Sequence, residues 1–319
     1  MDMQYLIWLQ ELRVNAGDMP EKIFNLITNA SGPLAMLLMA VMFWCINKRA
    51  GKFLMLAFAF GRLVNQLLKN TFCVYRPWIL DSDVHPVSSA LKSASSYSFP
   101  SGHTNVATAA YGGLAYYYRK KFPLLIIPCA LLILTVAFSR NFLGVHTPQD
   151  VLVAIIETFI VIVVVDKIVN RLEDERQDSL FFVVSMILGI AATAYFLMKS
   201  YPIDYLNGKV IVEPFRAERD ALGNMGSFAG VLIGLELERR FINFKVNVPL
   251  STKIVRIIIG GVLLGATYLL IMPFFKSLSF EFIGEFLRYF SANFVMAFLV
   301  PLIFTRIEKR SYGGKFYGR

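Results

Sequence analysis

The chain has 319 residues, of which 56% are hydrophobic, and its mean hydropathy is +0.56. A soluble protein of this size could not bury so much apolar surface in one core, so the composition predicts a membrane protein. The net charge of +10 is compatible with nucleic-acid binding, but no basic arm or recognition motif concentrates it. We therefore expect no nucleic-acid partner.

Residues 1–17 precede the first long apolar segment. They include Asp2 and Glu11 and lack a basic region followed by a small-residue cleavage site, so they do not resemble a signal peptide. Tyr5 and Trp8 begin a series of apolar residues at helical spacing. We predict a helix that lies in the membrane interface.

About nine further segments are apolar and long enough to span a membrane as helices. We place them at 32–47, 53–69, 103–118, 123–139, 149–167, 180–198, 221–238, 254–275 and 284–305. Alternate connections are rich in Lys and Arg and therefore face the cytoplasm. This arrangement predicts an all-α polytopic membrane protein with its N-terminus outside and its C-terminus inside.

The recognisable motifs all lie in the first half of the chain. We predict a catalytic membrane domain at 1–170, made of the interfacial helix and five spans, and an accessory four-span extension with a cytoplasmic tail at 171–319. The charged linker Asn170 to Ser179 separates them. The loop Ser200 to Ala221 is the longest of the second half; it either covers the active site or, as the simpler interpretation, only holds helices apart.

Three segments on the predicted outer face contain groups that bind and transfer phosphate. The first is Lys69-x6-Arg76-Pro77, in which two cations near a helix end can bind phosphoryl oxygens. The second is Pro100-Ser101-Gly102-His103, which opens a predicted helix. A helix N-terminus offers backbone N–H groups to an anion, and His103 can transfer a proton.

The third segment is Ser139-Arg140-x5-His146-x3-Asp150. His146 and Asp150 are four residues apart, so a helical turn would bring the carboxylate against the imidazole and orient it. No cluster of metal ligands accompanies these residues, and we expect neither a metal nor another cofactor.

Together these motifs resemble the three-part signature of the type 2 phosphatidic acid phosphatase family, over about residues 25–165. The resemblance implies that His146 is the nucleophile and forms a phosphohistidine, that Asp150 orients it and that His103 protonates the leaving alcohol. It further implies a phosphate-binding set made of Lys69, Arg76, Ser101, Gly102 and Arg140. It implies no metal requirement.

The resemblance predicts a membrane-integral phosphatase that hydrolyses a lipid phosphomonoester or diphosphate at the extracytoplasmic face. Glucose-6-phosphatase shares the signature and a similar span count, so a soluble phosphate ester is an alternative substrate. A lipid transporter, or a phosphotransferase that passes the phosphoryl group to an acceptor alcohol, could use the same anion site. Vanadium haloperoxidases share the pocket but are soluble. The sequence indicates no oligomeric state.

Two ionisable residues lie inside predicted spans, where a charge requires a partner or a cavity. Arg62 precedes Lys69 by seven residues, and Glu157 follows Asp150 by seven. Each therefore lies two helical turns inward from its motif. We hypothesise that Arg62 and Glu157 form an ion pair beneath the site.

Overall fold

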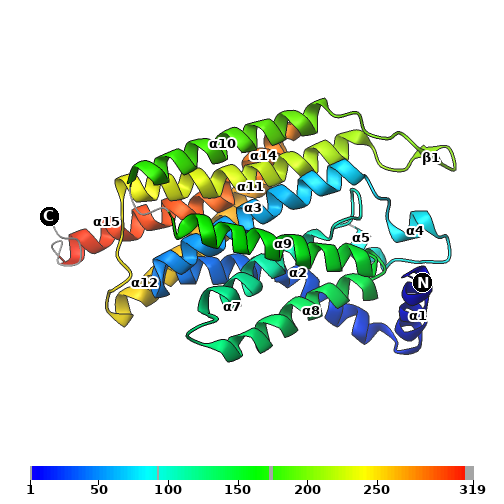
Figure 1. The fold of residues 1–319 in the computed structure, drawn as a ribbon, viewed down its shortest axis with the longest axis horizontal. Helices are drawn as coiled ribbons and strands as arrows, with labels where there is room; N and C mark the ends of the chain where they lie inside the picture. The colour runs from blue at the N-terminus through cyan, green and yellow to red at the C-terminus, as the bar shows by residue number, and fades with distance from the viewer. Residues whose placement is uncertain (1, 92, 172–174, 313–319) are drawn as a thin grey trace. The chain divides into compact units, whose positions relative to one another are not determined.

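The computed structural model describes residues 2–91, 93–171 and 175–312 and is mostly helical (Figure 1). The longer helices are α1 (Asp2–Asn15), α2 (Asp18–Val41), α3 (Lys48–Phe72), α8 (Ile126–Phe142), α9 (Pro148–Val169), α10 (Glu175–Met198), α11 (Pro214–Phe241), α12 (Leu250–Ala266), α14 (Glu281–Phe294) and α15 (Val300–Tyr312). The short ones are α4 (Pro77–Leu80), α5 (Ser88–Leu91), α6 (Gly102–Ala107), α7 (Gly113–Tyr118), α13 (Met272–Lys276) and the 3₁₀ helix η3 (Pro123–Leu125). Four π-helical segments, η1 (Met42–Ile46), η2 (Thr108–Gly112), η4 (Thr267–Ile271) and η5 (Val295–Leu299), continue neighbouring helices.

Five helical stretches of the described chain are long and apolar enough to cross a membrane. They are Asp18–Ile46, Pro123–Phe142, Asp178–Met198, Leu250–Lys276 and Glu281–Arg310. The first begins well before residue 32, because the polar residues after Asp18 lower the local hydropathy without interrupting the helix. The other predicted spans coincide with α3, α6 to α7, α9 and α11, and the count of nine stays a prediction.

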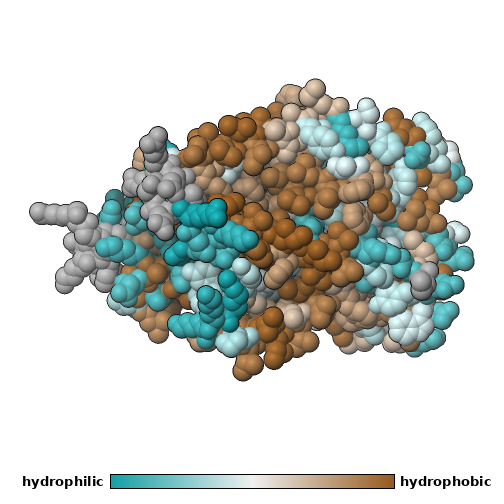
Figure 2. Space-filling view, in the orientation of Figure 1, coloured by the Kyte–Doolittle hydropathy of each residue, from teal (hydrophilic) through white to brown (hydrophobic). Residues whose placement is uncertain are grey.

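Many large apolar side chains of the long helices are exposed. Leu131 and Leu134 of α8 are 60% and 56% exposed, and Ile160 of α9 is 58% exposed. On the face shown in Figure 2, apolar side chains predominate over the long helices. Such a surface is favourable in hydrocarbon and unfavourable in water, which agrees with a membrane location.

The chain forms two compact units, each built from separate stretches of sequence. Unit 1 comprises residues 1–36, 60–164 and 198–218, and unit 2 comprises 37–59, 165–197 and 219–319. Neither unit is a continuous half of the chain, so the division near residue 170 stays a prediction. Part of the predicted linker Asn170 to Ser179, namely residues 172–174, lies outside the described residues.

In unit 1, α1 lies beside the end of α8 (Figure 1). Leu6 and Leu9 are buried in an apolar cluster that includes Phe142. Arg13 donates hydrogen bonds of 2.7 Å each to the carbonyls of Phe142 and His85. The N-terminal helix is therefore an integral part of the unit, while its interfacial location stays a prediction.

The predicted loop between Ser200 and Ala221 contains a short hairpin and the first turns of a helix. Strands β1 (Tyr205–Leu206) and β2 (Lys209–Val210) pair antiparallel in the connection between α10 and α11 (Figure 1). The turn residues Asn207 and Gly208 both have positive φ, as a tight two-residue hairpin turn requires. Helix α11 then starts at Pro214, earlier than predicted.

Candidate active site

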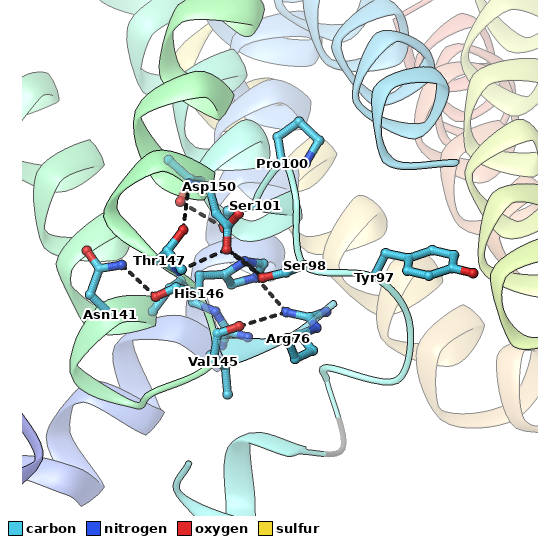
Figure 3. A network of polar contacts seen from close by, with 12 residues as sticks. Arg76, Tyr97, Ser98, Pro100, Ser101, Asn141, Val145, His146, Thr147 and Asp150 are labelled. Carbon is cyan, nitrogen blue, oxygen red and sulfur yellow. Dashed lines mark hydrogen bonds and ion pairs between the residues drawn. The ribbon is translucent and has the colours of Figure 1, made fainter. Parts of the chain in front are cut away.

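The three motif segments meet within unit 1 (Figure 3). Lys69 lies in the last turn of α3, and Arg76 immediately precedes α4. Ser101 is the N-cap of α6, and Gly102 and His103 are its first residues. The third motif spans the end of α8 and the start of α9. Residues up to 81 positions apart in sequence, Lys69 and Asp150, thus contribute to one site.

The end of α8 explains the spacing between Arg140 and His146. The N–H of Val145 donates to the Arg140 carbonyl at 3.2 Å, and the N–H of Gly144 donates to the Asn141 carbonyl at 2.9 Å. Gly144 has a φ of 72°. This is the Schellman arrangement, in which a left-handed glycine ends a helix and reverses the chain. His146 therefore follows directly after the reversal.

The start of α9 explains the spacing between His146 and Asp150. The Thr147 N–H donates to Asp150 Oδ2 at 2.8 Å, and the Asp150 N–H donates to Thr147 Oγ1 at 3.3 Å. With Pro148 at the first helical position, this is a capping box. His146 precedes the N-cap, so its ring reaches Asp150 from outside the helix.

The His146 imidazole is fixed at both nitrogens. Its Nδ1 lies 3.2 Å from Asp150 Oδ2, and its Nε2 lies 3.0 Å from an N–H of Arg76 (Figure 3). An ionised carboxylate can only accept a hydrogen bond and a guanidinium can only donate one. We therefore assign the proton of the neutral ring to Nδ1 and the lone pair to Nε2.

Burial lowers the pKa of His146 well below its ordinary value, and the positive charge of Arg76 lowers it further. The hydrogen bond with Asp150 acts in the opposite direction but is the weaker influence. The side chain is only 2% exposed. The imidazole is therefore neutral at neutral pH, which is the state that can act as a nucleophile.

Ser98 is a member of the site that the sequence motifs do not include. Its hydroxyl donates to Asp150 Oδ2 at 2.5 Å and lies 3.4 Å from His146 Nδ1. Its N–H donates to the Val74 carbonyl at 2.8 Å. Ser98 thus links the first motif segment to the carboxylate that contacts His146.

The two cations of the first motif both contact the loop that leads to α6. Lys69 Nζ donates to the carbonyls of Tyr97, Ser98 and Pro100 at 3.0, 3.2 and 2.8 Å. Arg76 donates to the carbonyls of Ser96 and Val145 at 2.8 and 2.9 Å. In this structure both side chains hold backbone in place.

Arg140 is fully buried at the end of α8. Its terminal nitrogens donate to Thr28 Oγ1 at 3.0 Å and to Ser93 Oγ at 3.3 Å, and its Nε has no hydrogen-bond partner in the described structure. The described hydrogen-bond partners of this cation are therefore neutral hydroxyl groups, and one of its buried donors has no partner in the described structure.

The start of α6 contributes a hydroxyl, an imidazole and backbone N–H groups. Ser101 is completely buried, and its oxygen accepts a hydrogen bond from Thr104 at 3.0 Å. Gly102 and His103 are half-buried. His103 lies near enough to Arg140 for the charge of the guanidinium to act on it, and it is also coupled electrostatically to His146. The predicted proton donor and the predicted nucleophile therefore lie in the same electrostatic environment.

Two further polar residues support the α8–α9 junction. Asn141 donates to the His146 carbonyl at 2.8 Å, and Thr147 forms the capping box with Asp150. The Thr-x-x-Asp spacing of the capping box is visible in the sequence. No comparable local signal marks Asn141 or Ser98.

The partners of Glu157 differ from the hypothesised ion pair. Its Oε1 accepts hydrogen bonds from Asn65 Nδ2 at 2.9 Å and from Asn105 Nδ2 at 3.1 Å. Arg62 acts on Glu157 electrostatically, while one of its guanidinium nitrogens lies 3.4 Å from the Gly102 carbonyl. The Thr158 hydroxyl adds a longer hydrogen bond of 3.4 Å to the same oxygen, and the ion pair with Arg62 stays a hypothesis. In the described part of the chain, no group of three or more His, Cys, Asp or Glu side chains is placed to hold a metal ion.

Comparisons with known proteins match both halves of the chain. The PAP2 superfamily matches residues 50–174, and the family described as PAP2 superfamily phosphatase, transmembrane extension, matches residues 222–311. Phosphatidylglycerophosphatase B of Bacillus subtilis (strain 168) is 32% identical over 152 residues, which are 46% of this chain and 68% of the relative. No solved structure matches the chain. Every candidate site residue lies within the first matched range.

Proposed function

The chain belongs to the PAP2 superfamily and is an integral membrane phosphatase, and we propose that it hydrolyses lipid phosphates through a phosphohistidine on His146. One observation carries the proposal. The ring of His146 lies between Asp150, which accepts a hydrogen bond from its Nδ1–H, and Arg76, which faces the Nε2 lone pair. A neutral, oriented imidazole beside a cation is suited to attack a phosphoryl group.

In the first step, the Nε2 lone pair of His146 forms a bond to phosphorus and the ester P–O bond breaks. His103, which holds a proton when the phosphate anion is bound beside it, gives that proton to the leaving oxygen, which departs as an alcohol. Asp150 stabilises the positive charge that develops on the imidazole, because its carboxylate accepts the Nδ1 proton in a hydrogen bond.

In the second step, a water oxygen attacks phosphorus and His103 takes the proton of that water. The N–P bond breaks, the electron pair returns to Nε2, and inorganic phosphate leaves. His103 therefore acts first as an acid and then as a base, and both steps balance without a cofactor or a metal ion.

The phosphoryl oxygens would lie among the cations of the first and third motifs and the start of α6. We assign their binding to Arg76 and Arg140, to the hydroxyl of Ser101 and to the backbone N–H of Gly102. Lys69 would contribute its positive charge, because its three N–H groups donate to the carbonyls of the loop before α6. Arg140 has a donor without a partner in the described structure. Arg76 would exchange its contact with Nε2 for one with a phosphoryl oxygen, which exposes the lone pair for attack.

The proposed substrate is a phosphomonoester or diphosphate lipid. The name of the Bacillus subtilis relative describes an enzyme that acts on phosphatidylglycerophosphate, and we extend lipid phosphate hydrolysis from it to this chain. The charge distribution of the loops supports about nine spans, an outside N-terminus and an extracytoplasmic active site.

The test is inorganic phosphate release by detergent-solubilised protein in EDTA, with phosphatidate, phosphatidylglycerophosphate, a polyprenyl diphosphate and glucose 6-phosphate. We expect His146→Ala to abolish release, with a loss of at least about 1000-fold. His85→Ala is the matched control, because that histidine is exposed and only its backbone makes described hydrogen bonds. Hydrolysis of glucose 6-phosphate alone would contradict a lipid substrate.

The phosphohistidine has a separate test. With p-nitrophenyl phosphate, the leaving group needs no proton, so His103→Ala retains the first step and loses the base of the second. We expect this variant to accumulate an acid-labile, alkali-stable phosphoenzyme, and the additional His146→Ala change to remove it. A phosphoenzyme that survives the loss of His146 would refute the proposed nucleophile.

A further inference from the structure

The segment 199–217, which belongs to the second half of the sequence, lies against the loop that carries Ser98. Tyr97, Tyr201, Val212 and Ala217 form one buried apolar cluster. The rings of Tyr97 and Tyr201 are stacked, with centroids 6.5 Å apart and an interplanar angle of 8°. The residue before Ser98 is therefore fixed by a residue far away in the sequence.

A second contact joins the same segment to the first motif. The Tyr75 hydroxyl donates to Asp204 Oδ2 at 2.5 Å. Burial and the neighbouring Asp204 raise the pKa of Tyr75 to about 12, so the phenol keeps its proton. The Asp204 carbonyl accepts the Ile211 N–H at 2.9 Å, which closes the base of the hairpin.

Both contacted residues are neighbours of groups that act on the site. Tyr97 offers its carbonyl to Lys69 at 3.0 Å and is followed by Ser98, whose hydroxyl holds Asp150. Tyr75 is followed by Arg76, which faces His146 Nε2. The segment 199–217 thus contacts the residues that precede Ser98 and Arg76. It contacts Tyr97 through the ring of Tyr201 and Tyr75 through a hydrogen bond with Asp204.

We propose that the segment 199–217 is a positioning element of the active site, in which Tyr201 and Asp204 hold the backbone that places Ser98 and Arg76. This inference rests on the proposed function and gives the second half of the chain a role in catalysis. Neither Tyr201 nor Asp204 touches the reacting atoms. They act through Tyr97 and Tyr75.

The experiment compares kcat and KM for phosphate release by full-length variants. We expect Tyr201→Ala to lower kcat by about 10- to 100-fold, because small displacements of catalytic groups cost that much, and to change KM by less than about 3-fold. Tyr201→Phe keeps the ring and should retain wild-type kcat. Tyr205→Ala is the matched control, because Tyr205 lies in the same segment, on strand β1, and is 66% exposed.

A double-mutant cycle tests the hydrogen bond between Tyr75 and Asp204. Tyr75→Phe and Asp204→Ala each remove the same hydrogen bond, so the double variant should lose no more activity than either single variant. Additive losses would show that the two side chains act separately, which would overturn the role assigned to their contact.

The decisive measurement is the kcat of the double variant in which Tyr201→Ala is added, as the second substitution, to Ser98→Ala. If Tyr201 acts through Ser98, the second substitution causes little further loss of kcat; an undiminished loss, in protein of unchanged thermal stability, would overturn the inference. The inference also fails if Tyr201→Ala is as active as Tyr205→Ala. Absence of hydrolysis by the wild-type protein would instead refute the proposed function.

Discussion

Buried cations in the two units have partners of different chemistry. In unit 2, Arg256 is completely buried and donates to both carboxylate oxygens of Glu308 at 2.7 and 2.8 Å. Lys48, which is partly buried, donates to the buried Glu238 at 2.8 Å in the same unit. In unit 1, Arg140 is equally buried, but its described partners are the hydroxyl groups of two residues, Thr28 and Ser93.

The difference separates structural cations from candidate ligand-binding cations. A buried guanidinium paired with a carboxylate has its charge compensated inside the protein. Arg140 forms no ion pair with a carboxylate in the described part of the chain, so its buried charge is compensated only when an anion arrives. If Arg140 binds phosphate as proposed, part of the favourable free energy of binding comes from compensating a charge that is already buried in the fold.

The largest effect that sharpens this comparison is expected for Arg140. Arg140→Met should lower kcat/KM by about 100- to 1000-fold, because a preorganised donor to the phosphoryl oxygens is lost. The thermal unfolding temperature should stay within a few degrees of wild type or rise, since no carboxylate is left unpaired. If Arg140→Met instead lowered the unfolding temperature strongly and its folded fraction kept full activity, Arg140 would be a structural cation like Arg256.

Arg256 is expected to behave in the opposite way. Arg256→Met leaves Glu308 buried without its partner and should lower the free energy of unfolding by about 3 kcal/mol, while kcat per folded molecule stays unchanged. The measurement is reversible unfolding in mixed detergent micelles. Arg256→Met combined with Glu308→Leu should recover most of the loss, and a double variant as unstable as the single one would contradict this account.

The family and the enzyme class follow from the sequence motifs, and the comparisons confirm both. The motif residues also meet in space because the local turns between them are encoded in short segments. Gly144 permits the reversal after α8, and the Thr147 to Asp150 capping box starts α9 at a defined residue. Such local signals are readable from sequence because each depends on only a few neighbouring residues.

Other features depend on partners far away in the sequence and were not predictable in the same way. Ser98 contacts Asp150 from a loop that Lys69 hydrogen-bonds and that Tyr201 packs against through Tyr97. The first half of α2 contains polar residues that lower its mean hydropathy. The predicted span therefore starts at residue 32, although the helix begins at Asp18. The hairpin at Asn207-Gly208 is different. This dipeptide favours a tight two-residue turn, so the hairpin could have been predicted from the sequence.

The pH dependence of activity tests whether the cations of unit 1 lower the pKa of His146. Because the pKa of His146 lies well below its ordinary value of about 6.5, the neutral nucleophile persists as pH falls through 6.5 and is lost only at lower pH. The acid limb of kcat/KM should therefore lie below pH 6.5. Arg76→Met removes a charge that lowers this pKa, so the residual activity should show its acid limb at higher pH. An unmoved limb would mean that Arg76 does not act on His146.

The smallest effect concerns the helix start that carries Asp150. Thr147→Ala removes the hydroxyl that accepts the Asp150 N–H and should cost about 1 kcal/mol of stability, while Thr147→Ser keeps the cap. Thr135→Ala is the matched control, because its hydroxyl bonds only a carbonyl of its own helix, α8, at Leu131. Since the backbone N–H of Thr147 still donates to Asp150 Oδ2 in the alanine variant, kcat should fall only a few-fold. A loss as large as that of Arg140→Met would show that the hydroxyl contributes directly to catalysis, and the boundary between supporting and phosphate-binding groups in unit 1 would have to be redrawn.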